Sequence, residues 1–205
     1  MIIGLCGGSG SGKGAVCSIF NGLGVPSIDT DKVYHDLTSY MSDCLLEIKS
    51  AFGDSVVTDG ALNRAKLAGV VFADGADNKR ALLNDIAHRH ILARVRKDIA
   101  ELYAKGYTNV IVDAPLLFES GFHKECDVIV GVIADADIRI LRIMKRDGID
   151  YSSAIRRIGS QLSDDELKKK CDYLITNNGG TEELTSSVAK LYDNILGGKN
   201  GKFNC

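Results

Sequence analysis

Five short apolar segments, separated by stretches with helical periodicity, restrict the possible fold more than any other feature of this chain. Each segment is β-branched or apolar almost throughout and is bounded by Gly, Asn or Asp, as buried strands are. The expected strands are residues 2–6, 25–29, 109–113, 128–133 and 173–176. Strands of this kind that alternate with helices form a parallel sheet covered on both faces. We therefore predict an α/β fold with a five-stranded parallel sheet.

The helices expected between these strands have recognisable starts and ends. One is expected over residues 14–23 and another over 138–146. Ser163 and Glu166 have the spacing of a capping box. Thr181 is expected to cap a terminal helix that has two glutamates in its first turn and closes at Gly197 and Gly198, before a frayed tail over 199–205.

The interval between the second and third strands is too long for one crossover. It holds three helix-like stretches, which are residues 31–50, 60–72 and 78–104. We interpret the interval as a helical excursion from the sheet edge. The length of 205 residues predicts one domain, 1–205, with 31–104 as a helical region and about 140–162 as a lid.

Charge and hydropathy exclude several classes of partner. The formal net charge is −2, without the positive excess that non-specific nucleic-acid binding needs. No apolar run approaches the roughly 20 residues of a membrane helix, and the first six residues lack the basic region of a signal peptide. The six cysteines form no CxxC pair, so we expect reduced thiols. These features predict a soluble cytoplasmic protein without membrane or nucleic-acid partners.

A glycine-rich loop directly follows the first strand. Gly7, Gly12 and Lys13 fill the GxxxxGK frame of a P-loop, between a strand and a helix. Glycines let successive N–H groups turn toward phosphates, the helix directs its positive end at them, and the lysine bridges β- and γ-oxygens. Gly14 stands where Ser or Thr normally offers a hydroxyl to Mg²⁺.

A dinucleotide fingerprint is an alternative interpretation of the same loop. Gly10, Gly12 and Ala15 satisfy GxGxxA, and Asp29 follows at the end of the second strand. In that reading the first glycine lies beyond the tight turn and Lys13 has no role. The P-loop is therefore the favoured interpretation.

Acidic residues follow two of the strands, at the sheet edge where ligands of open α/β folds bind. Asp29 and Asp31 follow the second strand, where a carboxylate can accept a proton from an attacking hydroxyl or hold a metal-bound water. The alternative is that one of them only caps the next helix. Asp113 ends the third strand as in a Walker B segment, and Glu119 in the PLLFE stretch can face an acceptor.

Arginines at helical spacing follow the fourth strand. Arg139, Arg142 and Arg146 share one face of the expected helix, and Arg157 follows Gly148, a plausible hinge. Such a stripe is usually solvated surface, but arginines on a lid neutralise a transferring phosphoryl group in kinases. The histidines do not have the spacing of a metal site.

These elements, in this order, resemble the dephospho-coenzyme A kinase family over most of the chain. The matching stretches are GLCGGSGSGKG at 4–14, SIDTDKVYHDL at 27–37, GALNRAKLAGVVF at 60–72, VDAPLLFESG at 112–121, RIMKRD at 142–147 and RRIGSQLSDDELKKKCDYLITNNG at 156–179. The P-loop alone is generic, whereas the DxD, PLLFE and R-x-x-x-Q…DYxIxNxG set is specific. The chain departs from the family at Gly14 and Ala15, where Ser-Thr is usual, and at Arg89, where Pro is usual.

The resemblance implies the P-loop nucleoside triphosphate hydrolase fold with a helical substrate-binding insertion and a small lid. It implies transfer of the γ-phosphoryl of ATP to the ribose 3′-hydroxyl of dephospho-coenzyme A, with Mg²⁺. Asp31 is the expected base, and Lys13 and Arg146 are expected to stabilise the transferring group. The residues expected at ATP are Gly8, Ser9, Gly10, Ser11, Gly12, Lys13, Gly14, Ala15, Arg142, Arg157 and Asn177.

The acceptor and the metal have expected residues of their own. Dephospho-coenzyme A is expected at Asp31, His35, Arg64, His88, Pro115, Leu116, Leu117 and Glu119. Asp31 and Asp113 are expected to hold Mg²⁺ through water. Two other functions remain open: a nucleotide-binding regulator without catalysis, which Gly14 makes worth testing, and a Rossmann-type dinucleotide binder. The oligomeric state has no signal in the sequence.

Overall fold

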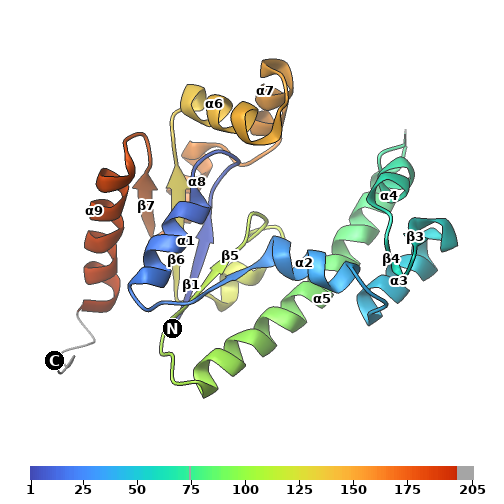
Figure 1. The fold of residues 1–205 in the computed structure, drawn as a ribbon, viewed down its shortest axis with the longest axis horizontal. Helices are drawn as coiled ribbons and strands as arrows, with labels where there is room; N and C mark the ends of the chain where they lie inside the picture. The colour runs from blue at the N-terminus through green and yellow to red at the C-terminus, as the bar shows by residue number, and fades with distance from the viewer. Residues whose placement is uncertain (74, 198–205) are drawn as a thin grey trace. The chain divides into compact units, whose positions relative to one another are not determined.

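The computed structural model describes residues 1–73 and 75–197 (Figure 1), which divide into two compact units. The first unit contains Met1–Ser27 and the chain from Gly106 onward, and the second is Ile28–Lys105. Each unit has a hydrophobic core of its own. The helices of the described residues all fall short of the length and apolar character that a bilayer-spanning segment requires.

The five-stranded sheet confirms the predicted fold class. Its strand order is β2-β5-β1-β6-β7, and β1 pairs in parallel with β5 and β6, as does β6 with β7. The strands are β1 Ile2–Cys6, β2 Ser27–Asp29, β5 Val110–Asp113, β6 Val128–Ile133 and β7 Tyr173–Thr176. The second strand begins two residues later than expected, just after Pro26, a residue that has no N–H to donate.

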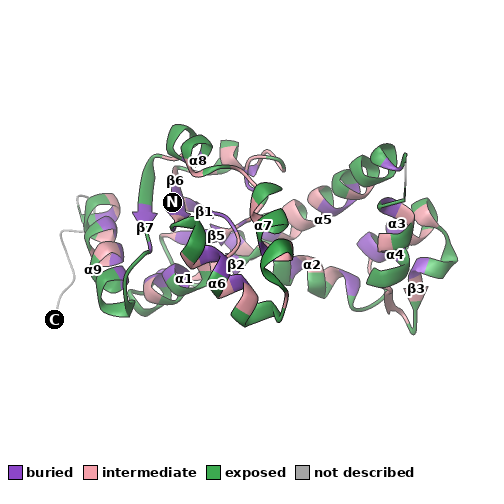
Figure 2. Ribbon diagram, turned by 90° about the horizontal axis from the view of Figure 1, so that it is seen from above, coloured by how far each residue is buried: buried purple, intermediate pink, exposed green. Residues whose placement is uncertain are grey.

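One face of the sheet is covered by α1 (Lys13–Gly22) and α9 (Thr181–Tyr192), which also contact each other (Figure 1). Each helix has a buried and an exposed side (Figure 2). Their buried side chains join those of the strands in one core: Val16, Cys17, Phe20, Leu184, Val188 and Leu191. On the other face the Leu117 side chain packs against Gly4, where an added Cβ would lie 3.0 Å from it.

The terminal helix ends differently from the prediction. Thr181 is its first helical residue and Gly180 its N-cap, which has no side chain, so the expected threonine cap is wrong. The helix continues into a π-helical turn, Asp193–Gly197. Gly198 and the expected tail at 199–205 lie outside the described residues.

The helices after β6 include one that was not among the expected helices. α6 (Ala136–Asp147) and α8 (Asp164–Lys170) were expected, and α8 has the predicted capping box of Ser163 and Glu166. Between them lies α7 (Tyr151–Gly159), whose N-cap Asp150 accepts a hydrogen bond from the Ser153 N–H at 2.6 Å. This short helix is amphipathic, with Ala154 buried and Ile158 packed against the same cluster, but no helix was expected over its residues.

The second unit is helical, as expected, but more subdivided. The stretch 31–50 is two helices, because the Ser42 hydroxyl accepts from Leu45 N and starts a new helix. The stretch 60–72 begins as a strand of a two-stranded hairpin. The elements are α2 Thr30–Thr38, α3 Asp43–Phe52, the 3₁₀ turn Asp54–Val56, β3 Val57–Thr58, β4 Ala61–Leu62, α4 Arg64–Val71 and α5 Asp77–Ala104.

The hairpin turn consists of Asp59 and Gly60, both with positive φ (52° and 76°). Asp-Gly at this place is the usual chemistry of a two-residue hairpin turn. The Asp-Gly pair is present in the sequence, but the helix-like stretch expected over 60–72 includes its glycine. The described cysteines are Cys6, Cys17, Cys44, Cys126 and Cys171, and all five are free thiols as expected.

Candidate functional site

The glycine-rich loop joins the end of β1 to the start of α1. Gly7, Gly10 and Gly12 have φ values of 151°, 78° and 97°, which residues other than glycine rarely adopt. The helix begins at Lys13, whose Nζ donates to the Gly7 carbonyl at 3.1 Å. The loop thus places a helix N-terminus and an ammonium group at one end of the sheet, as anion binding requires.

Neighbouring elements approach this loop too closely for side chains. A Cβ added at Gly10 would lie 2.6 Å from the Arg139 carbonyl oxygen, and one at Gly12 would lie 2.1 Å from Asn177 Nδ2. Asn177 is almost fully buried and donates to the Ser11 carbonyl at 2.8 Å. These positions therefore need glycine for space as well as for backbone freedom.

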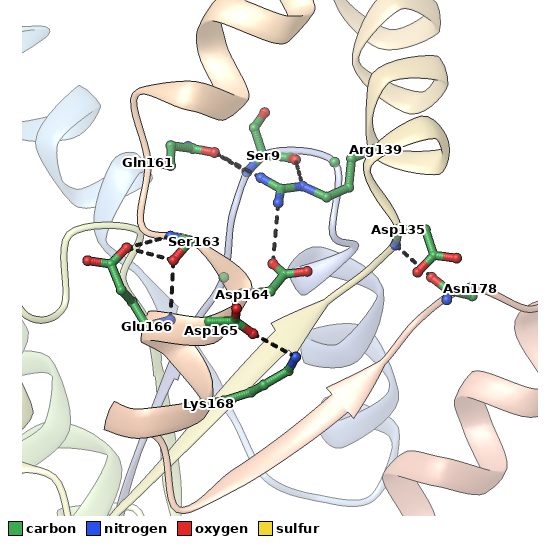
Figure 3. Close-up of polar contacts among 12 residues, drawn as sticks. Ser9, Asp135, Arg139, Gln161, Ser163, Asp164, Asp165, Glu166, Lys168 and Asn178 are labelled. Carbon is green, nitrogen blue, oxygen red and sulfur yellow. Dashed lines mark hydrogen bonds and ion pairs between the residues drawn. The ribbon is translucent and has the colours of Figure 1, made fainter.

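Ser9, in the middle of the loop, has both backbone polar groups bonded to side chains from outside the loop (Figure 3). Its carbonyl accepts from Arg139 Nε at 3.0 Å, and its N–H donates to Gln161 Oε1 at 2.7 Å. Arg139 Nη2 also donates to Gln161 Oε1, at 3.3 Å. Arg142 Nη1 donates to the next carbonyl, that of Gly10, at 3.2 Å. Together with Asn177, which bonds to the Ser11 carbonyl, these three side chains fix the backbone of consecutive loop residues.

Arg146 at the end of α6 and Arg157 on α7 gather around one carboxylate. Arg146 Nε and Nη2 donate to the two oxygens of Asp147 at 2.7 and 2.9 Å, and Arg157 Nη1 bonds to the same carboxylate. Arg146 Nη2 also donates to Ser9 Oγ at 3.2 Å. The hydrogen bonds and charge of Arg146, with the charge of Arg157, lower the pKa of Asp147 to about 2. Asp147 thus stays ionised and orients both arginines.

A pocket of about 460 Å³ opens beside the start of the loop, within the first unit. Three predicted acceptor residues line it: Pro115, Leu116 and Glu119. Its other walls come from the end of β1, the loop and the segment before α8, which includes Gln161. Leu117 does not line the pocket, because its side chain is fully buried beneath β1.

Asp113 ends β5 next to the loop-bearing strand, where it is in register with Leu5 of β1. Its Oδ2 accepts a weak hydrogen bond from the Cys17 thiol at 3.7 Å. Carboxylate oxygens are the ligands that Mg²⁺ prefers. Asp113 therefore offers oxygen of the kind that the expected cation takes, although the described residues hold no cluster of three or more His, Cys, Asp or Glu that could bind a metal directly.

The remaining predicted residues belong to the second unit. Asp29 is the N-cap of α2, because its Oδ1 accepts from the N–H groups of Asp31 and Lys32 at 2.9 and 3.1 Å. The capping alternative thus holds for Asp29 and leaves Asp31 exposed in the first turn of α2. His35 is exposed on α2, Arg64 is the first residue of α4, and His88 is half-buried on α5.

Sequence reasoning did not single out three residues that the structure places at the loop and lid. Arg139 was grouped with a stripe that is usually solvated, yet it is only 4% exposed. Gln161 was noted only as part of a motif, and Asp147 only as a residue between arginines. The available signal was the spacing of Arg139 with Arg142 and Arg146 after a strand, which places all three on the side of α6 that meets the loop.

A lysine-bearing phosphate loop on a five-stranded parallel sheet defines a P-loop nucleotide-binding protein. Residues 1–183 match the family model described as dephospho-CoA kinase. A dephospho-CoA kinase of Syntrophotalea carbinolica is 36% identical over 202 residues, which cover 98% of this chain and 95% of that protein. The chain belongs to the dephospho-CoA kinase family.

Two solved structures share the fold of this chain. A crystal structure from Thermus thermophilus has a TM-score of 0.81 at 25% identity and covers 98% of each chain. A dephospho-CoA kinase from Campylobacter jejuni has a TM-score of 0.70 at 24% identity, covers 97% of this chain and 98% of its own, and shows the shared fold. The chain is thus an ATP-dependent kinase of the final step of coenzyme A biosynthesis, and neither the regulator nor the dinucleotide binder is favoured.

The low pKa of Asp147 predicts a pH-dependent contribution to stability. A carboxylate with a depressed pKa stabilises the fold fully above its unfolded pKa and loses that contribution as pH falls toward its folded pKa. Asp147→Asn should therefore lower Tm at pH 7, and the difference from wild type should shrink as pH falls from about 4 toward about 2. Asp165→Asn, which alters an exposed pair with Lys168, is the control. A Tm difference that stays constant over this range would contradict the paired state of Asp147.

Proposed function

We propose that this kinase transfers the γ-phosphoryl of ATP to the ribose 3′-hydroxyl of dephospho-coenzyme A, with the triphosphate held in loop 7–14. The observation that carries the proposal is the loop itself, whose peptide groups at Ser9, Gly10 and Ser11 are held by surrounding side chains while Lys13 starts the helix behind it. A prearranged cradle of N–H groups favours charge that develops on the transferring phosphoryl. We place this reaction in the cytoplasm, without nucleic-acid or membrane partners.

The loop and lid residues have distinct proposed roles. Lys13 and Arg146 stabilise the transferring group, because both carry donors at the loop. The backbone from Gly8 to Ala15 binds the phosphates, as the P-loop motif implies. Arg142 and Asn177, which also donate to the Gly10 and Ser11 carbonyls, bind the nucleotide beside the loop. Arg157 closes over the nucleotide from the proposed lid, about residues 140–162.

The acceptor has proposed residues of its own. Asp31 takes the proton of the 3′-hydroxyl, since an exposed carboxylate in the first turn of a helix is accessible to a substrate hydroxyl. His35, Arg64 and His88, in the helical region 31–104, bind the rest of the coenzyme. Pro115, Leu116 and Glu119 contribute the pocket wall, and Leu117 supports them from beneath.

Mg²⁺ is part of the proposal. When bound, it neutralises charge on the β- and γ-phosphate oxygens. Asp31 and Asp113 are the proposed holders, each through water, since Mg²⁺ keeps several waters and needs few protein ligands. Gly14 offers no hydroxyl, so one coordination position falls to water.

The direct test is ADP release by purified protein, measured with and without dephospho-coenzyme A at saturating ATP. The proposal predicts release that depends on the acceptor, together with a product phosphorylated at the 3′ position. A folded protein that binds ATP and releases no ADP at any Mg²⁺ or Mn²⁺ concentration would instead be the nucleotide-binding regulator.

Lys13→Ala should lower kcat by about 10²–10³, the range for loss of one prearranged stabiliser of developing charge. ATP affinity should fall much less, because the backbone cradle remains. Fixed-time assays of the 3′-phosphorylated product measure kcat, and ATP titrations measure the ATP affinity. Lys190→Ala removes an exposed lysine on α9 and is the control. Near-full activity of Lys13→Ala would refute the phosphate-loop assignment.

Asp31→Asn should lower kcat by about 10²–10⁴, the range for loss of a general base, with ATP affinity and Tm retained. Asp29→Asn makes the same chemical change two residues earlier. Asparagine caps helices about as well as aspartate, so this control should keep both stability and turnover. An Asp31→Asn protein with a large loss of Tm and wild-type kcat in its folded fraction would point to a structural role instead.

Gly14→Ser should lower the Mg²⁺ concentration that gives half-maximal rate, because the new hydroxyl replaces a water. Gly14 is helical, and among the described residues an added Cβ meets no further atom within 4 Å, so Tm should not fall. Initial rates against Mg²⁺ for both forms give the comparison. Identical Mg²⁺ dependence in two equally stable proteins would show that position 14 has no part in holding the cation.

A further inference from the structure

The Arg139 guanidinium is buried beside the loop. It is 4% exposed, and burial lowers its pKa, with the charge of Asp164 opposing that shift. Its contact with Asp164 is long, 3.5 Å between Nη1 and Oδ1 (Figure 3). Burying a charge with only one distant partner is unfavourable for stability. The arginine at this position is therefore better explained by the loop that it contacts than by the ion pair.

Arg139 and Gln161 together hold both backbone polar groups of one loop residue, Ser9. Arg139 donates to the Ser9 carbonyl, Gln161 accepts from the Ser9 N–H, and the two side chains bond to each other. Gln161 follows the lid helix α7 in the chain, whereas Arg139 lies on α6. A Cβ added at Gly8 would lie 2.0 Å from Arg139 Nη2 and 3.1 Å from Gln161 Oε1, so the loop backbone lies directly on this pair.

The Ser9 side chain also contacts Arg146, a residue proposed to stabilise the transferring phosphoryl group. Ser9 Oγ accepts from Arg146 Nη2 at 3.2 Å. A shift of Ser9 would therefore move both the loop N–H groups and the point at which Arg146 is held. Such displacements matter because catalytic hydrogen bonds act only when they are aimed at the reacting group.

We propose that Arg139 and Gln161 are positioning residues for phosphoryl transfer: they fix the backbone of Ser9, and through it the loop and Arg146, before the nucleotide binds. This inference rests on the proposed function. Arg139 acts through the loop, and Gln161, which also lines the pocket, acts through its contact with the Ser9 N–H. Their contribution is to kcat, because the loop's alignment with the transferring group depends on them.

The test replaces Gln161 in two ways. Gln161→Leu keeps the approximate size and removes the acceptor, and it should lower kcat by about 10- to 100-fold, as a misplaced catalytic group does. The Kd for ATP should change little, and any change in the KM for dephospho-coenzyme A, whose proposed pocket Gln161 also lines, should be smaller than the loss of kcat. Gln161→Glu keeps an oxygen facing both Arg139 and the Ser9 N–H, and should retain kcat within about fivefold through a charge-assisted bond. Lys168→Gln, at an exposed pair on α8, is the control.

Hydrogen exchange of the Ser9 amide provides a readout apart from activity. The amide should be protected in the nucleotide-free wild type and in Gln161→Glu, and should lose that protection in Gln161→Leu. Unchanged kcat in folded Gln161→Leu protein would overturn the proposal. So would a loss of kcat that comes with a lower Tm and an equal fold-loss of ATP affinity. If the wild type binds ATP but transfers nothing to dephospho-coenzyme A, the proposed function fails, and equal Ser9 exchange in wild type and Gln161→Leu would then refute the loop contact on its own.

Discussion

The hydrogen bonds that the phosphate loop receives from outside itself are the constraint on which the site depends. A loop rich in glycine has many backbone conformations, and ordering each residue costs about 1–2 kcal/mol of conformational entropy. Here Ser9 is held by Arg139 and Gln161, and Ser11 by Asn177. The elements that provide these side chains follow β6 and β7, so the strand order of the sheet places them around the loop at the end of β1.

The arginines around the loop fall into two groups that differ in burial and in hydrogen-bond partners. Arg139 is buried and bonded to backbone and amide oxygens, so it belongs to the framework. Arg146 and Arg157 are exposed and share the carboxylate of Asp147. An exposed ion pair is weak and is readily exchanged for a stronger partner. In the proposed reaction, Asp147 can therefore hold Arg146 and Arg157 in place and still release them toward a phosphoryl group.

The strands, the phosphate loop and the fold class could be predicted from the sequence because they rest on local signals: apolar runs bounded by Gly or Asp, and glycine spacing before a lysine. The helix α7 is amphipathic, so its pattern was readable as well, although no helix was expected over its residues. The environment of Arg139 needed the tertiary structure, since a buried arginine and a solvated one have the same helical spacing. The Asp59-Gly60 hairpin turn was readable, and a helical interpretation of 60–72 hid it.

A pair of crystal structures, one without nucleotide and one with ADP, tests most directly whether the loop is shaped before it binds phosphate. The account predicts that the backbone of residues 7–14 superposes within about 1 Å, as in other preorganised sites, with Gln161 and Arg139 on Ser9 in both. A nucleotide-free loop that adopts a different path, with the Ser9 N–H detached from Gln161, would contradict it.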